Sequence, residues 1–226
     1  MDIGILGTGS VARTLGGRLD ELGHDVRTGT RDPAETLARS EPDRFGAPPY
    51  RDWQNAHPGV ALGTFSEAAA HGELLINATA GAASLDVLRA AGVDRLAGKV
   101  LLDVANPLDL SSGMPPALSV CNTDSLAEQI QRLVPAARVV KSLNTVNAAV
   151  MVDPGRVGGG EHSVFLSGDH ADAKAVVTEL LRGFGWRDIV DLGDLSTARG
   201  AEMLLPLWLR LSGALGTLAF NVKVVH

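Results

Sequence analysis

The stretch "DIGILGTGSVARTLGGRLDELGHDVRTGTRDP" occupies residues 2–33 and decides the fold. Residues 3–7 form a short apolar run that ends in glycine, as a strand buried on both faces does. Residues 11–22 place Leu15, Leu19 and Leu22 on one face of a helix, which Gly23 ends. Residues 25–30 predict a second strand. The stretch therefore predicts two strands joined by a crossover helix.

The glycine-rich turn between the first strand and the helix matches G-x-G-x-x-A over residues 7–12, one form of the dinucleotide fingerprint. Gly7 permits the tight turn, Gly9 lets the backbone approach a pyrophosphate, and Ala12 lets helix and strand pack closely. Phosphates would lie at the helix N-terminus, where free N–H groups and the helix dipole favour negative charge. The alternative interpretation is a turn that binds no ligand.

The second strand ends in Gly29, Thr30 and Arg31, where an NAD site has an acid that holds the adenosine ribose. Gly29 removes the repulsion that such an acid would exert on the 2′-phosphate of NADP. Thr30 can donate a hydrogen bond to phosphate, and Arg31 offers a planar charged fork suited to it. We therefore expect NADP(H). In the alternative interpretation Arg31 is a solvated charge and Asp32 binds the ribose.

Polar side chains also follow three later strands. The clusters are Asn77, Thr79 and Gly81; Asn106 with Pro107; and Ser142, Asn144, Thr145 and Asn147. Ligands of doubly wound sheets lie at the carboxyl ends of the strands, so small amides and hydroxyls there can bound a nicotinamide and leave room for a flat reactant above it. The alternative for each residue alone is a loop-capping role.

Catalytic side chains and metal ligands are not indicated. The six histidines are scattered without metal-ligand spacing, and no nucleophile elbow appears. Lys141 is interpreted as a structural residue of its strand. No acid or base is assigned, because hydride transfer between two bound redox rings needs mainly stacking and correct distance.

The rest of the first two thirds alternates strand and helix. Strands are expected at residues 60–63, 73–78, 99–104 and 138–143, with helices between them. This rhythm predicts an α/β fold with a Rossmann-type, doubly wound, mainly parallel sheet. Residues 41–59, rich in proline and polar groups, are expected to form an insertion or covering loop.

The pattern changes from about residue 153. A glycine-rich loop, a strand at 163–168, a helix at 171–185, a strand at 188–193 and a long helix from Ser196 to Leu211 are expected. We predict an NADP-binding Rossmann domain at residues 1–152 and a small α-rich C-terminal domain at 153–226, which supplies dimerisation and acceptor-site helices. The last helix is apolar on most sides and must be covered. A homodimer is favoured, and a deep groove within the chain is the alternative.

Composition excludes several classes of function. The net charge of -6 and the lack of clustered Lys and Arg argue against nucleic acid as a partner. No apolar run reaches the roughly 18 residues of a membrane span, and no secretory signal is seen. Cys121 is expected to be a buried filler in a reducing compartment. We expect a cytoplasmic protein with a small-molecule redox acceptor.

The segments "ILGTGSVARTLGGRL", "TGTRDP", "LLINATAGAAS", "LLDVANPL" and "VVKSLNTVNA" resemble, in this order, the coenzyme F420-dependent NADP oxidoreductase family. The resemblance covers nearly the whole chain. It implies an N-terminal Rossmann domain, a small C-terminal part, homodimers, and hydride transfer between NADPH and the deazaflavin F420.

The same resemblance implies roles for individual residues. It implies that the pyrophosphate is bound by Gly7, Thr8, Gly9, Ser10 and Val11, and that the 2′-phosphate is bound by Thr30 and Arg31. The residues implied to line the route to the nicotinamide are Ala78, Thr79 and Asn106. The residues implied to lie beside the nicotinamide are Asn144, Thr145 and Val146.

Residues 122–148 are also similar to the cytosolic oxidoreductase domain of the membrane ferric reductases, which pass hydride from NADPH to a flavin. This similarity supports NADPH more than it identifies the acceptor. Three alternatives to F420 chemistry stay open: a reductase of a small imine or carbonyl, similar to relatives of pyrroline-5-carboxylate reductase; a flavin reductase; and a non-catalytic NADPH sensor.

Overall fold

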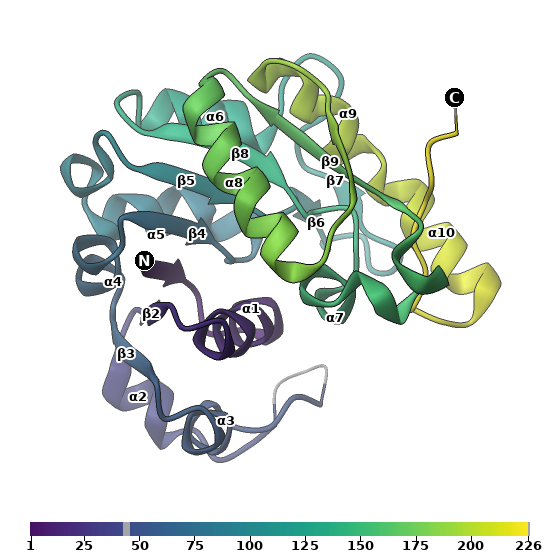
Figure 1. Cartoon of the computed structure of the whole chain (residues 1–226). Coiled ribbons are helices and arrows are strands. Elements are labelled where there is room, and N and C mark those ends of the chain that lie inside the picture. Colours follow the sequence, from purple (N-terminus) through teal and green to yellow (C-terminus); the bar gives the residue numbers. More distant parts are fainter. Residues whose placement is uncertain (43–45, 226) are drawn as a thin grey trace.

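One sheet of eight strands dominates the computed structural model, which describes residues 1–42 and 46–225 (Figure 1). The strands lie in the order β10-β9-β8-β5-β4-β1-β2-β3. Their bounds are β1 Asp2–Leu6, β2 Asp25–Thr30, β3 Val60–Thr64, β4 Leu74–Asn77, β5 Val100–Asp103, β8 Arg138–Ser142, β9 Ser163–Gly168 and β10 Asp188–Asp191. The short strands β6 Leu108–Asp109 and β7 Ala117–Leu118 form a separate antiparallel pair that the sequence did not indicate.

The strand order reverses at β1, which pairs in parallel with both β2 and β4. Leu6 lies opposite Gly29 on one side and Asn77 on the other, so the carboxyl ends of three strands meet beside Gly7. Strand β9 runs antiparallel to β8, and β10 is parallel to β9, so these two strands run opposite to the other six. The predicted mainly parallel, doubly wound sheet is confirmed, and its switch point lies at the glycine turn.

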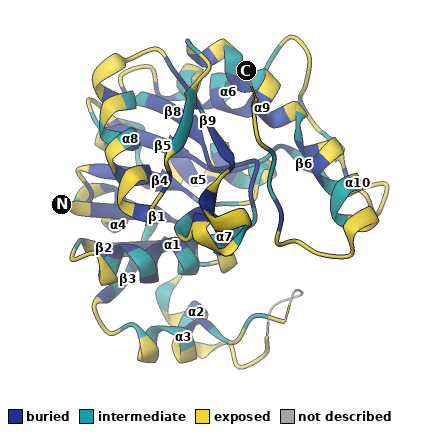
Figure 2. Cartoon of the chain, turned by 45° about the vertical axis from the view of Figure 1, so that its right-hand side comes forward, coloured by how far each residue is buried: buried dark blue, intermediate teal, exposed yellow. Residues whose placement is uncertain are grey.

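Helices cover both faces of this sheet. Their bounds are α1 Ser10–Glu21, α2 Pro33–Ala38, α3 Tyr50–Ala56, α4 Phe65–His71, α5 Ser84–Ala91, α6 Leu126–Leu133, α7 Ala148–Val152, α8 Ala171–Phe184, α9 Ala198–Met203 and α10 Leu205–Leu215. Buried residues of α1, α7 and α8 belong to one core cluster, and those of α4, α5 and α6 to a second. Figure 2 shows the central strands buried between these two layers.

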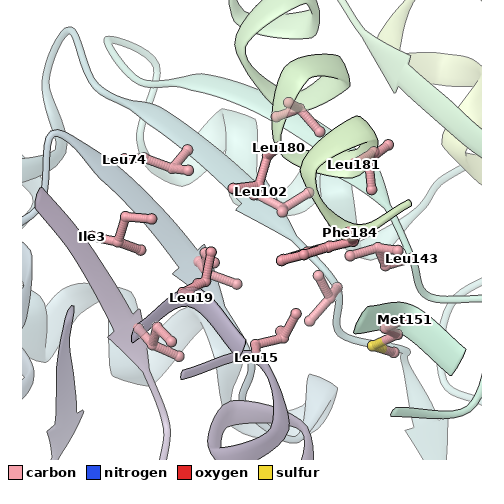
Figure 3. Packing of buried hydrophobic residues seen from close by; sticks show 14 of the residues in the cluster. Ile3, Leu15, Leu19, Leu74, Leu102, Leu143, Met151, Leu180, Leu181 and Phe184 are labelled. Carbon is pink, nitrogen blue, oxygen red and sulfur yellow. The ribbon is translucent and has the colours of Figure 1, made fainter. Parts of the chain in front are cut away.

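The first core cluster joins the two halves of the chain. Leu15 and Leu19 of α1 and Phe184 of α8 converge over strand residues such as Ile3 and Leu102 (Figure 3). Side chains of this size, almost fully removed from water, each contribute roughly 1.5–3 kcal/mol to stability. The strands after residue 153 therefore extend the same sheet and share its core. The predicted division into two domains, residues 1–152 and 153–226, stays a prediction.

Three expectations from the sequence need correction. The long helix from Ser196 to Leu211 is two helices, α9 and α10, because Pro206 lacks the N–H that would continue the hydrogen-bond ladder. Residues 41–59 include a helix, α3, although residues 43–45 of that stretch lie outside the described residues. Cys121 is exposed rather than buried, in the loop before α6.

No helix within the described ranges has both the length and the apolar character needed to cross a membrane.

Candidate cofactor and acceptor site

A cleft with a volume of about 670 Å³ lies at the carboxyl ends of β4, β5 and β8, next to the N-terminus of α1. The structure brings nine of the predicted site residues into its lining. They are Gly9, Ser10, Val11, Ala78, Thr79, Asn106, Asn144, Thr145 and Val146. Thr8 lines an adjoining pocket of about 680 Å³, while Gly7, Thr30 and Arg31 line neither space.

The glycine turn has the geometry of a pyrophosphate site. Gly7 has a φ of +127°, and a Cβ there would lie 2.7 Å from the carbonyl oxygen of Ala78. A Cβ at Gly9 would meet no protein atom within 4 Å, because it would project into open space. Gly9 is the N-cap of α1 and offers no side chain to its first N–H groups. These N–H groups are therefore available to an anion, as a bound pyrophosphate requires.

The end of β2 presents one exposed cation. Arg31 makes no hydrogen bond or ion pair to the residues that the structure describes, whereas the neighbouring Asp32 caps α2 by accepting from the N–H of Glu35 at 3.0 Å. Thr30 is buried, and its hydroxyl lies 2.8 Å from that of Thr36. Gly29 has a packing role as well, because a Cβ there would lie 3.0 Å from the Cβ of Ala68.

The adjoining pocket reveals residues that sequence reasoning missed. Thr36, Arg39 and Arg13 line it together with Thr8. The Nε of Arg13 donates to the carbonyl oxygen of Thr8 at 2.8 Å, and its guanidinium carbon lies 5.5 Å from the ring centre of Tyr50. Helix α3 thus covers this end of the site. The signal for Arg13 was its position one helical turn after Gly9; nothing local indicated Tyr50.

Two asparagines connect the ends of β5 and β8. Asn106 Nδ2 donates to the backbone oxygen of Asn144 at 2.8 Å, and Asn144 Nδ2 donates to Asn106 Oδ1 at 3.0 Å. Asn144 also donates to the carbonyl oxygen of Ala201 in α9 at 3.1 Å. Leu143, with a φ of +62°, turns the chain there, and a bulky residue adopts such a φ only under strain. The pair fixes the floor of the cleft.

A buried ion cluster lies beneath this floor. Lys141 Nζ is 2.8 Å from Asp103 Oδ2 and 3.0 Å from Glu202 Oε1, and all three side chains are almost inaccessible to water. Burial is the largest influence on the pKa of Lys141 and by itself would lower it. The two carboxylates together outweigh burial and raise this pKa above its ordinary value. Burial also raises the pKa of Glu202, against the opposing effect of Lys141. Lys141 does not line the cleft, which agrees with its interpretation as a structural residue.

The opposite wall of the cleft is apolar. It is formed by Leu108, Leu110, Leu205, Trp208 and Leu209. Trp208 stacks on Phe220 of the C-terminal segment, with ring centres 5.0 Å apart and planes at 22°. No cluster of potential metal ligands occurs in the part of the chain that the structure describes. Polar groups at one end and an apolar wall at the other suit two flat ring systems bound face to face.

Comparison with known proteins agrees with this geometry. The sequence model of the family described as "NADP oxidoreductase coenzyme F420-dependent" matches residues 2–107. The crystal structure of a provisionally named F420-dependent NADP reductase of Arthrobacter sp. FB24 is 58% identical, covers 100% of both chains and has a TM-score of 0.96.

Two curated proteins are similar over shorter parts of their length. Metalloreductase STEAP3 of Rattus norvegicus is 32% identical over 211 residues, 91% of this chain and 37% of that protein. The F420-dependent NADP reductase of Methanocaldococcus jannaschii is 27% identical over 120 residues, 53% of each chain. The chain thus spans only a third to a half of the length of these relatives. By its sequence match and by its near-identical fold over the full chain, this protein belongs to the coenzyme F420-dependent NADP oxidoreductase family.

Proposed function

We propose that this protein transfers a hydride between NADP(H) and the deazaflavin coenzyme F420. The observation that carries the proposal is that one cleft contains both an uncapped helix N-terminus at Gly9 and an apolar wall around Trp208. A nicotinamide bound above Asn106 and Asn144 would face this wall, and the space between them suits the flat ring of a deazaflavin.

The proposed contacts follow the geometry. The turn from Gly7 to Val11 would bind the pyrophosphate, and Thr30 and Arg31 at the end of β2 would bind the 2′-phosphate. The nicotinamide half would lie along the nicotinamide-side residues, which are Ala78, Thr79, Asn106, Asn144, Thr145 and Val146. The bound cofactors supply the redox chemistry, a hydride from one ring to the other with a proton from solvent. The chain itself orients the two rings and excludes water.

The relatives support both halves of this proposal. The names of the family and of the Methanocaldococcus jannaschii relative include F420 and NADP, and the Arthrobacter protein matches this chain over its whole length. An exposed Arg31 without a partner in the described chain fits an added phosphate better than a ribose hydroxyl, because charged hydrogen bonds are the stronger kind.

The direct test mixes the purified protein with NADPH and oxidised F420 and follows the visible absorbance of the deazaflavin. We expect the band to bleach, with much slower bleaching when NADH replaces NADPH. Binding of NADPH is measured in parallel by fluorescence. A preparation that binds NADPH and leaves F420 oxidised at high protein concentration would exclude this acceptor.

A flavin is the second candidate acceptor, favoured by the similarity to metalloreductase STEAP3 over 91% of this chain. The same assay with FMN or FAD distinguishes the two acceptors by the band that bleaches. Reduction of a small imine or carbonyl would instead oxidise NADPH without bleaching either ring. A non-catalytic NADPH sensor would bind NADPH and oxidise it with none of these acceptors.

We further propose that the protein works as a homodimer through its C-terminal part. Three leucines of α10 and the segment after it support this, because Leu207, Leu215 and Leu218 are each more than half exposed. Figure 2 shows exposed turns of α10 at the rim of the molecule. Light scattering during size-exclusion chromatography should give twice the chain mass. A cytoplasmic location stays a prediction from the sequence.

A further inference from the structure

Three side chains next to the glycine turn form a closed ring of hydrogen bonds. Asn77 Nδ2 lies 3.0 Å from Ser84 Oγ, Ser84 Oγ lies 2.9 Å from Thr79 Oγ1, and Thr79 Oγ1 lies 2.7 Å from Asn77 Oδ1. Asn77 and Ser84 are fully buried, whereas Thr79 lines the cleft. Thr79 is therefore the one member of the ring that a ligand in the cleft can meet.

The buried ion cluster determines the direction of every bond in this ring. Asp103 pairs with Lys141, so its carboxylate is charged and only accepts hydrogen bonds. Its Oδ1 lies 2.8 Å from the side chain of Asn77, which must therefore present its NH₂ group to Asp103. The carbonyl oxygen of the same amide then faces Thr79.

The remaining hydrogens follow from this orientation. Thr79 must donate its only hydroxyl hydrogen to Asn77 Oδ1, because an amide oxygen cannot donate. Ser84 accepts from Asn77 and consequently donates its own hydrogen to Thr79. All hydrogens of the ring are thus in use. What Thr79 has left to offer a ligand is one lone pair of electrons.

We propose that Thr79 is a specificity-determining residue that accepts a hydrogen bond from an O–H or N–H group on the nicotinamide half of NADP(H). The inference rests on the proposed function in one respect, that NADP(H) occupies this cleft. A phosphate oxygen carries no hydrogen and is disfavoured beside this lone pair. Thr79 therefore fixes the position of the dinucleotide along the cleft, with phosphates at Gly9 and the nucleoside at β4. Asn77, Ser84 and Asp103 are positioning residues for it.

Equilibrium binding of NADPH to Thr79→Val and Thr79→Ser tests the proposal without any acceptor. Valine has the shape of threonine without the hydroxyl, so we expect about two- to tenfold weaker binding of NADPH, the range of one neutral hydrogen bond. Serine keeps the hydroxyl and should bind within about twofold of the unmodified protein. The control ligand is adenosine 2′,5′-bisphosphate, which lacks the nicotinamide half and should bind all three proteins equally.

Two reduced analogues then locate the donor group. One is the 3-acetylpyridine analogue of NADPH, which lacks the carboxamide N–H, and the other lacks both hydroxyls of the nicotinamide ribose. We expect one of them to bind the unmodified protein more weakly than NADPH does, but to bind Thr79→Val as tightly as NADPH does.

Equal NADPH affinity in Thr79→Val and the unmodified protein would overturn the proposal. So would equal losses for both analogues in both proteins, or a loss of the control ligand in Thr79→Val. If the binding results are as expected but the protein does not reduce F420, the proposed acceptor is rejected and the role of Thr79 in binding NADP(H) is retained.

Discussion

Asp32 accepts a hydrogen bond from the backbone N–H of Glu35, with Oδ1 and N 3.0 Å apart, and so caps α2 directly beside Arg31. A helix cap of this kind is worth about 0.5–2 kcal/mol, and its carboxylate is oriented toward the helix. The acid that could hold an adenosine ribose is therefore engaged, while the adjacent guanidinium is exposed. This arrangement favours NADP(H) over the alternative in which Asp32 binds the ribose.

Replacing Arg31 with alanine should weaken NADPH binding about tenfold and leave NADH binding almost unchanged. A charged hydrogen bond to phosphate contributes about 1.5 kcal/mol at an exposed site, and NADH has no such phosphate. Titration of intrinsic or NADPH fluorescence measures both dissociation constants. Arg95→Ala is the matched control, an exposed arginine in the short turn Val93–Leu96 that precedes β5. Equal losses for the two nucleotides would rule out the phosphate role.

Gly7→Ala and Gly9→Ala should separate stability from binding. Gly7 has a positive φ, and a Cβ added there would lie 2.7 Å from the carbonyl oxygen of Ala78. Alanine at this position should therefore lower the free energy of unfolding by about 1–3 kcal/mol. Gly9 has a φ of -75°, which alanine adopts freely, and nothing within 4 Å of an added Cβ. The Gly9→Ala protein should have the same free energy of unfolding as the unmodified protein. It should bind NADPH at least about tenfold more weakly, because the added methyl group would occupy the space of the pyrophosphate.

Urea denaturation of the two glycine variants and fluorescence titration with NADPH measure these effects. Normal NADPH affinity in a stable Gly9→Ala protein would mean that the pyrophosphate lies elsewhere.

Glu202→Gln should change how stability depends on pH. Burial raises the pKa of Glu202 above its ordinary 4.5, so its contribution to stability is complete below about pH 4.5 and is lost as pH rises through the raised value. The free energy of unfolding of the unmodified protein should therefore fall, relative to that of Glu202→Gln, from pH 4 toward neutrality. Urea denaturation at several pH values measures this difference.

Glu128→Gln is the control of opposite sign. A hydrogen bond from Arg199 lowers the pKa of Glu128, so its contribution is present above the ordinary value of 4.5 and is lost as pH falls below it. Two results would contradict the raised pKa of Glu202. One is a difference in unfolding free energy between Glu202→Gln and the unmodified protein that does not change with pH, and the other is a difference that changes with pH in the same direction for both variants.

Leu209→Ala should raise the KM for the acceptor about fivefold without changing the dissociation constant of NADPH. Leu209 belongs to the apolar wall of the cleft, and the side-chain area lost to a bound ring corresponds to roughly 1 kcal/mol. Leu192→Ala, which changes a leucine that directly follows β10, is 36% exposed and lies outside the cleft lining, is the matched control and should leave both constants unchanged in steady-state kinetics. A loss of NADPH affinity in Leu209→Ala would place the acceptor elsewhere.

Much of the fold was predictable because it depends on local patterns. The apolar strand before Gly7, the leucines of α1 and the polar residues after β4, β5 and β8 each follow from a few neighbouring residues. The predicted secondary structure was wrong where single residues differ from the pattern of the residues around them. Pro206 divides an otherwise helical run, and Tyr50 belongs to a helix inside a proline-rich stretch. Periodicity averages over a window and does not register such single positions.

The sequence by itself determined the order of most strands and helices along the chain, the glycine turn and the cationic end of β2, since each is a property of adjacent residues. Only the tertiary structure decided that Glu202 reaches Lys141, that Tyr50 lies against Arg13, and that Asn77, Thr79 and Ser84 close a ring. The first two contacts join residues far apart in the chain, and the direction of the ring depends on the ion pair of Asp103 with Lys141 on a neighbouring strand. Packing of the sheet creates these contacts, and no local pattern encodes them.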